Sequence, residues 1–306
     1  MAARLWRRVL GLALALAAAS GGLLSWARAL PWWYAPVIAL AVLLAMLVAV
    51  IALSFVIAQI ATDPAPERRS ANLLRLRALL SEVADFTLAV LAMSADAQPR
   101  RTAPLLPAPP AARPVLLLHG ILCNGRVWHA LQRRLHAAGF GPVEALDVEP
   151  LLVDIDMQAR RVTPELLALQ CRSNGERVLI IAHSMGGLIA RALLRDLGSI
   201  AIRRIVTIAS PHHGTVLVRG LPWQNAAQMS RNSAWLRALN AAQEGSFSVP
   251  LASIYSLDDY LVAPAHSARL QGAENHELCG VGHFGMLRSR RALDCVMATL
   301  SQACPR

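Results

Sequence analysis

The sequence contains no lysine, because all 30 of its basic residues are arginine. Charged residues make up only 16% of the chain and hydrophobic residues 55%, which is not the composition of a purely soluble protein. The formal net charge is +11, but the arginines are scattered, without interleaved aromatic residues or a nucleic-acid-binding motif. We therefore expect no nucleic-acid partner. Attraction to anionic lipid headgroups explains the basic surplus, and a merely solvated basic surface explains it equally well.

Cysteine is also scarce, and its spacing argues against a metal site. The five cysteines form no C-x-x-C pair and show no metal-ligand spacing, so no metal is expected. Their odd number leaves at least one free thiol. We expect reduced, structural cysteines, with Cys295 and Cys304 able to pair only in an oxidising compartment.

Long apolar segments, in contrast, dominate the N-terminal part of the chain. Residues 9–27 carry no charge, and residues 37–58 contain a serine as their only polar side chain. A helix over the second segment is about 33 Å long, enough to cross a hydrocarbon core of about 30 Å. The aromatic residues 32–34 between the two segments suit a membrane–water interface. We therefore expect a transmembrane helical hairpin within residues 1–62, with helices at about 9–27 and 37–60.

The placement of arginine predicts the orientation of this hairpin. Three arginines precede the first segment and four follow the second within residues 68–77, whereas Arg28 alone lies in the connecting loop. The positive-inside rule then places both ends of the hairpin in the cytoplasm. Residues 4–20 also resemble a cleavable signal peptide. Cleavage there would leave the second segment as an anchor, with the rest of the chain still cytoplasmic.

Residues 63–113 connect the hairpin to the remainder of the chain. Apolar residues recur at helical spacing over 73–93, which predicts a helix that lies on the membrane surface or packs on the following domain. Six prolines within 98–114 predict an extended spacer.

From residue 114 to residue 306, apolar strand patterns alternate with helical patterns. This alternation predicts one α/β domain, with a mostly parallel sheet covered by helices on both faces. Residues 215–248 leave room for a small helical insertion. Strands are expected at 114–118, 142–148, 177–182, 203–209, 250–255 and 276–281, and helices at 131–138, 157–171, 185–197 and 284–300.

The segment Ala182-His-Ser-Met-Gly186 lies between an expected strand and an expected helix. That layout is typical of a nucleophile elbow, a sharp turn that presents a serine at the edge of a sheet. The turn requires small residues on both sides of Ser184, and Ala182 and Gly186 are small. We expect Ser184 to adopt a strained backbone conformation at the tip of the turn.

A serine hydroxyl becomes a good nucleophile only when a base, itself oriented by a carboxylate, takes its proton. In a parallel sheet these groups lie at the carboxyl ends of successive strands, in the chain order Ser, Asp, His. Asp258 and Asp259 both follow the fifth expected strand, and His283 follows the sixth. His283 is therefore the predicted base, and either aspartate fits as the acid. Three other histidines fit this order less well: His212, His213 and His276.

The tetrahedral intermediate of acyl transfer carries an oxyanion that needs two fixed N–H donors. One is expected from Met185, directly after the nucleophile. The other is expected from Ile121, in the loop His119-Gly120-Ile121 that follows the first strand. His119 and His183 are expected to support these loops as packing residues.

Four segments of the sequence together resemble the small bacterial lipases of the α/β-hydrolase fold. These segments are 119–121, 182–187, 253–262 and 280–283, and the lipases share the alanine of the elbow. The resemblance covers about residues 114–300 and implies that the acid is Asp259. The hairpin, the proline spacer and residues 215–248 depart from the lipase pattern.

The resemblance implies a carboxylic-ester hydrolase that acts on an acyl ester or a lipid and needs no cofactor. With the hairpin, it implies an enzyme anchored in a bacterial inner membrane, with its catalytic domain in the cytoplasm. A thioesterase or an acyltransferase would use the same residues. Two further alternatives are a non-catalytic membrane scaffold with a hydrolase-like domain and a metal-dependent hydrolase built on His212 and His213.

Overall fold

A single parallel sheet organises the C-terminal part of the protein. The computed structural model describes residues 1–28, 31–61, 72–95, 113–243 and 246–302, so most of the expected proline spacer lies outside the described residues. All neighbouring strands are parallel, in the order β2-β1-β3-β4-β5-β6. The strands are β1 (Val115–Leu118), β2 (Val143–Leu146), β3 (Val178–His183), β4 (Ile202–Ile208), β5 (Leu251–Ser256) and β6 (Glu274–Leu278).

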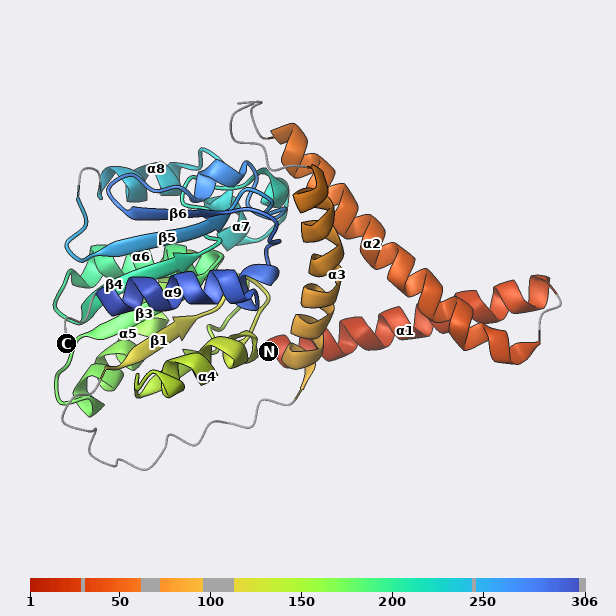
Figure 1. Ribbon diagram of the computed structural model, residues 1–306, viewed down its shortest axis with the longest axis horizontal. Helices are drawn as coiled ribbons and strands as arrows, with labels where there is room; N and C mark the ends of the chain where they lie inside the picture. The colour runs from red at the N-terminus through yellow and green to blue at the C-terminus, as the bar shows by residue number, and fades with distance from the viewer. Residues whose placement is uncertain (29–30, 62–71, 96–112, 244–245, 303–306) are drawn as a thin grey trace.

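Helices cover both faces of this sheet, as the alternating pattern predicts (Figure 1). Helices α4 (His129–Ala137) and α9 (Arg290–Gln302) pack on one face. Helices α5 (Ile155–Arg172) and α6 (Met185–Leu197) pack on the other. Alternate residues of β1 enter the two cores, which is why the central strands are continuous apolar runs.

The segment after β4 contains the small helical insertion that was expected at 215–248. Within the described part of this segment lie a 3-10 turn, η4 (Val216–Val218), and two short helices, α7 (Gln224–Met229) and α8 (Ala234–Ala241). Other 3-10 turns are η3 (Gly125–Trp128), which leads into α4, and η5 (Ala265–Ala268), which leads into β6.

Two expected elements near the C-terminus differ from the observed ones. The last strand occupies 274–278 rather than 276–281, because its pairing with β5 begins at Glu274 and the chain then leaves the sheet. The expected helix at 284–300 is split into a 3-10 turn, η6 (Gly285–Leu287), and α9. The break falls at Arg288, whose φ of −128° and ψ of −30° depart from helical geometry.

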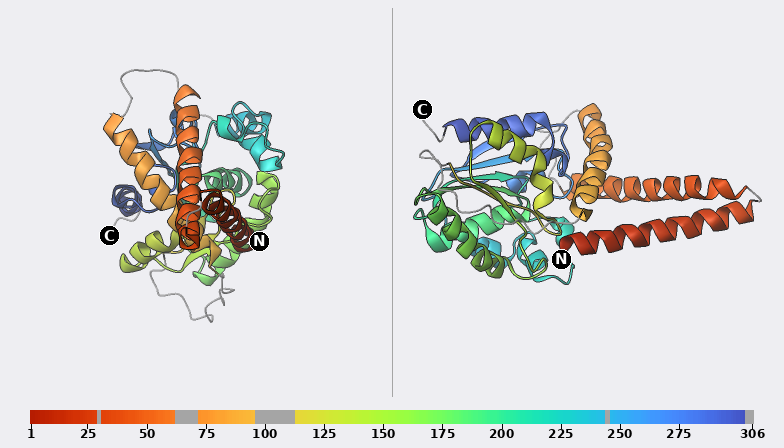
Figure 2. Two further views of the ribbon diagram at one scale, coloured as in Figure 1. Left: turned by 90° about the vertical axis from the view of Figure 1, so that its right-hand side faces the viewer. Right: turned by 90° about the horizontal axis from the view of Figure 1, so that it is seen from below.

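The N-terminal segment forms the expected helical hairpin. Helix α1 (Ala2–Ala27) and helix α2 (Ala35–Ala61) flank a 3-10 turn, η1 (Trp32–Tyr34), and the closed end projects away from the sheet (Figures 1 and 2). Helix α1 begins earlier than the expected residue 9, because the intervening arginines are good helix formers.

The two hairpin helices are candidate membrane spans by length and composition. Only 18% of the apolar window of α1 and 11% of that of α2 is buried, so their apolar side chains are largely exposed. A signal sequence near the N-terminus would pass the same test of length and composition.

Helix α3 (Asn72–Ser94) lies across the edge where the strands end, between the sheet and the hairpin (Figure 1). One face packs on the sheet domain through Ala78, Glu82, Ala89 and Met93, which are buried. Leucines on the opposite face are exposed, Leu73 to 75%. Of the two placements expected for this helix, the structure therefore shows packing on the domain.

The open end of the hairpin contacts the same edge of the domain. The Nε1–H of Trp6 in α1 donates a hydrogen bond to the carbonyl of Leu122, at 2.7 Å. In α2, the ring of Phe55 stacks on Tyr260, with the ring centroids 5.0 Å apart and the planes at 13°. Both hairpin helices therefore contact the sheet domain, α1 at the loop after β1 and α2 at the loop after β5.

The hairpin depends on close approach of its two helices, which small residues allow. A Cβ atom on Gly21 would lie 2.2 Å from the carbonyl oxygen of Ala35, whereas one on the adjacent Gly22 would meet open space. We expect Gly21→Leu to separate the helices by about 2 Å, because interaxial distance follows the side chains at the contact. Double electron–electron resonance between spin labels at the exposed positions Leu14 and Leu44 measures this change. Gly22→Leu is the matched control, and equal distances in the two variants would contradict the packing.

Candidate active site

Ser184 occupies a strained turn between β3 and α6. Its backbone dihedrals are φ +55° and ψ −126°, in a region that residues with a Cβ rarely adopt. The Ser184 N–H donates a hydrogen bond of 2.9 Å to the carbonyl of Ile208, at the end of β4. The turn therefore has the backbone geometry of a nucleophile elbow.

Small residues allow the neighbouring loop to lie directly against this turn. A Cβ atom on Gly186 would lie 2.4 Å from the carbonyl oxygen of Leu118, and one on Gly120 would lie 2.8 Å from the Cβ of Ser184. Ala182 is completely buried at the end of β3. Larger side chains at these positions would push the loop after β1 away from the serine.

The loop after β1 is held in place by His119. Its Nδ1–H donates to the carbonyl of Gly120 at 2.8 Å, and its Nε2 accepts from the N–H of Val148 at 2.9 Å. Burial lowers the pKa of His119, so the ring stays neutral and keeps both bonds. Within the described chain, the N–H groups of Ile121 and Met185 donate no hydrogen bond. Two backbone donors are thus left available beside Ser184.

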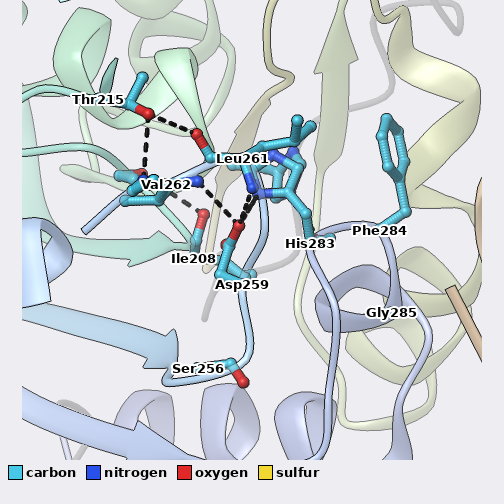
Figure 3. Close-up of polar contacts among 12 residues, drawn as sticks. Ile208, Thr215, Ser256, Asp259, Leu261, Val262, His283, Phe284 and Gly285 are labelled. Atoms are coloured by element: carbon cyan, nitrogen blue, oxygen red, sulfur yellow. Dashed lines mark hydrogen bonds and ion pairs between the residues drawn. The ribbon is translucent and has the colours of Figure 1, made fainter. Parts of the chain in front are cut away.

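A buried histidine–aspartate pair lies at the same edge of the sheet (Figure 3). The Nδ1 of His283 is 2.8 Å from Oδ2 and 3.0 Å from Oδ1 of Asp259. The same Oδ1 accepts the N–H groups of Leu261 at 2.8 Å and Val262 at 2.9 Å. These bonds fix the carboxylate, which in turn places the Nδ1 proton of His283 and leaves its Nε2 free to accept a proton.

Two opposing effects act on the pKa of His283. Burial would lower this pKa, but the negative charges of Asp259 and Glu82 outweigh burial, and the net shift is upward. The adjacent His183 lies with its ring centroid 4.6 Å from that of His283, and burial holds its pKa well below the usual value. His183 is thus a neutral neighbour, whose Nε2–H donates to the carbonyl of His283 at 3.3 Å.

The structure brings these groups to one edge without joining all of them by hydrogen bonds. Among the residues described, the hydroxyl of Ser184 makes no hydrogen bond to the imidazole of His283. Such bonds are commonly long in unliganded sites and shorten when a substrate binds. His183 links the two, because its ring contacts that of His283 and its Nδ1 lies, with Ser184, against the position of Gly120.

The two adjacent aspartates have different partners. Asp258 accepts the N–H of Gly280 at 2.6 Å through Oδ2, and its Oδ1 lies 4.0 Å from Nε of Arg75. Only Asp259 of the two contacts His283. The geometry therefore favours Asp259 over Asp258 as the acid, an alternative that the residues alone left open.

The three competing histidines have other partners, and Nδ1 of His213 lies 3.2 Å from Nδ2 of Asn240. The Nε2 of His212 is 3.0 Å from the hydroxyl of Thr207, and burial holds its pKa well below the usual value. His276 pairs with Glu274 at 2.7 Å within β6. Within the described ranges, no group of three His, Cys, Asp or Glu side chains is arranged to hold a metal ion.

Glu82 of α3 is the site residue that sequence reasoning missed. Its Oε1 accepts the N–H of Phe284 at 2.7 Å, and its Oε2 accepts that of Gly285 at 3.0 Å. Burial raises the pKa of this carboxyl to about 7. No local signal pointed to it, because the leucines that make the helical pattern at 73–93 lie on the exposed face, opposite Glu82.

A family model described as "Domain of unknown function (DUF7379)" matches residues 80–275, which is more than half of the chain. The chain belongs to this family. The matched range begins inside α3 and includes Glu82. No curated protein matches the sequence.

Solved structures with the same fold include two lipases. Aspergillus fumigatus lipase B is 21% identical, with a TM-score of 0.54, over 63% of this chain and 55% of its own. The mature form of Bacillus licheniformis lipase BlEst2 is 15% identical, with a TM-score of 0.54, over 63% of this chain and 94% of its own. The chain thus spans about half the length of the Aspergillus lipase. At these identities the likeness shows the fold alone, and that fold is the expected α/β-hydrolase fold.

The strain at Ser184 can be measured without any substrate. Glycine adopts positive φ at no steric cost, whereas a residue with a Cβ in this region costs about 1–3 kcal/mol. We expect Ser184→Gly to have a free energy of unfolding about 1 kcal/mol larger than that of Ser184→Ala, since both lack the hydroxyl. Chemical denaturation in detergent measures the difference. A Ser184→Gly variant no more stable than Ser184→Ala would show that the turn is relaxed.

Proposed function

We propose that this protein is a membrane-anchored serine hydrolase that cleaves carboxylic esters. The observation that carries the proposal is the strained Ser184 turn at the edge that also holds the buried His283–Asp259 pair. The lipase structures that share the fold support an acyl ester as the substrate class.

In the proposed reaction, the hydroxyl of Ser184 attacks the acyl carbon while Nε2 of His283 takes its proton. Asp259 keeps the imidazole in the required tautomer and stabilises its protonated form. The N–H groups of Ile121 and Met185 bind the oxyanion of the tetrahedral intermediate. His283 then protonates the leaving alcohol. Water next attacks the acyl carbon while Nε2 of His283 takes its proton, and His283 returns a proton to the oxygen of Ser184 as the carboxylic acid leaves.

The helices around this edge favour a lipid as the acyl ester. The exposed apolar surfaces of α1 and α2 suit a bilayer, and their open end contacts the loops at the edge where Ser184 lies. We propose a membrane unit at residues 1–62, a connecting segment at 63–113 and a catalytic domain at 114–306. We propose a bacterial inner membrane as the location, and the arginine distribution favours the cytoplasmic side for the catalytic domain.

Labelling by a fluorophosphonate probe tests the nucleophile. We expect the full-length protein in detergent to be labelled and Ser184→Ala to remain unlabelled, because only an activated serine reacts at a useful rate. A panel of p-nitrophenyl esters of rising chain length, matched thioesters and an added alcohol acceptor then separates esterase, thioesterase and acyltransferase activity. An unlabelled wild-type protein that also hydrolyses no member of the panel would favour a non-catalytic scaffold.

The adjacent aspartates provide a matched pair for the acid. We expect Asp259→Asn to lower kcat by about 10³–10⁴-fold, since the amide no longer holds the correct tautomer of His283. Asp258→Asn removes the same charge one residue away, from a carboxylate bonded to Gly280, and should retain most activity. Ester hydrolysis at saturating substrate measures both. Equal losses in the two variants would argue against the assigned acid.

A further inference from the structure

A buried carboxylate lies next to the proposed base, and the proposed acyl-transfer steps do not use it. Glu82 of α3 is completely buried, and its two oxygens accept the N–H groups of Phe284 and Gly285. These residues directly follow His283 on the same loop (Figure 3). Gly282 leaves room for the carboxylate of Glu82, since a Cβ atom at this position would lie 2.2 Å from Oε2 of Glu82.

The donors around Glu82 fit its ionised form. Besides the two N–H groups, the phenol of Tyr260 lies close enough to interact with the carboxylate. An ionised carboxylate only accepts hydrogen bonds, so these donors match it, whereas a protonated one would add a donor at a site crowded with donors. Among the described residues, no arginine or histidine forms a salt bridge with Glu82. The nearby cation available to it is His283 in its protonated state.

Glu82 also joins the two loops that carry the proposed acid and base. Tyr260 follows Asp259 directly in the chain, and Phe284 follows His283. One side chain from a helix outside the sheet therefore holds both loops. It also places a second negative charge beside the imidazole, in addition to that of Asp259.

We propose that Glu82 is a positioning residue of the proposed hydrolase, which fixes the loop of His283 and stabilises the imidazolium formed during acyl transfer. The inference rests on the proposed function. It makes α3 a structural part of the active site rather than a connector between hairpin and catalytic domain.

The sign of the expected pH effect follows from the charges that face these groups. Around His283 and Glu82 lie the following titratable or charged side chains: Asp259, Tyr260 and His183 near the imidazole, and Asp85, Arg288 and Cys123 near Glu82 and Tyr260. Burial keeps His183 neutral, and Asp85 is paired with Arg288 at 3.1 Å. Above a pH of about 7, the pKa of its carboxyl, Glu82 is mostly ionised, and removal of that charge destabilises the protonated imidazole and lowers the pKa of His283.

The first test compares Glu82→Gln with Asp85→Asn, which removes a negative charge from the same helix one turn further along. With an ester substrate, we expect Glu82→Gln to move the acid limb of the kcat/KM profile about one unit to lower pH. The plateau of kcat should fall by about tenfold, the factor that corresponds to one pKa unit. Asp85→Asn should move the limb much less. A Glu82→Gln limb that coincides with that of the wild type would overturn the proposal, because a purely structural role leaves the limb in place.

A second measurement does not depend on turnover. In Ser184→Ala protein labelled with ¹³C-histidine, the His283 resonance is identified by its loss in His283→Gln and titrated by NMR. We expect the pKa of His283 to be about one unit lower when Glu82→Gln is added. If the wild type hydrolyses no ester, the proposed function fails while this titration still decides the role of Glu82. An unchanged pKa would overturn it.

Glu82→Asp covers the case in which Glu82→Gln does not fold. It retains the charge, but its shorter side chain cannot reach both N–H groups of the loop. We expect a lower kcat with an acid limb close to that of the wild type. A limb displaced to lower pH in Glu82→Asp, with its charge still present, would contradict the proposal.

Discussion

All six strands of the sheet run in the same direction, and this constraint places every element of the candidate site at one edge. The loops after β1, β3, β5 and β6 carry Gly120, Ser184, Asp259 and His283, and each loop leaves the sheet at its carboxyl end. The same edge is covered by α3 and contacted by the open end of the hairpin (Figure 1). The candidate site and the contacts of the hairpin therefore share one edge of the domain.

The parts of the site that could be predicted from the sequence are those with a local cause. The small residues around Ser184 predict a tight turn. The order of the strands predicts that an aspartate and a histidine follow it in the chain and lie at the same edge of the sheet. The choice between Asp258 and Asp259 has no local cause, since both follow the same strand. It depends on Gly280, which draws Asp258 away, and on Leu261 and Val262, which hold Asp259 toward the imidazole.

Glu82 could not be predicted because its partners lie more than 200 residues away in the sequence. The same loop also departs from the expected closing helix. The N–H groups of Phe284 and Gly285 bond to Glu82 in a turn, and the regular helix begins only at Arg290. The spacing of apolar residues over 284–300 predicts one helix, and it contains no information about a carboxylate that comes from α3.

The contacts at the base of the hairpin bear on how the protein can be handled. A chain shortened to begin after α2 would lose the bond from Trp6 to Leu122 and the ring of Phe55 that covers Tyr260. Leu122 has a backbone φ of +59°, an unfavourable conformation for leucine, and it lies next to Ile121, whose N–H is a candidate oxyanion donor. Removal of the hairpin would thus take this bond away from the loop at Leu122 and expose the ring of Tyr260, which lies beside the proposed base His283. A fragment without the hairpin would therefore differ from the full chain at the candidate site itself.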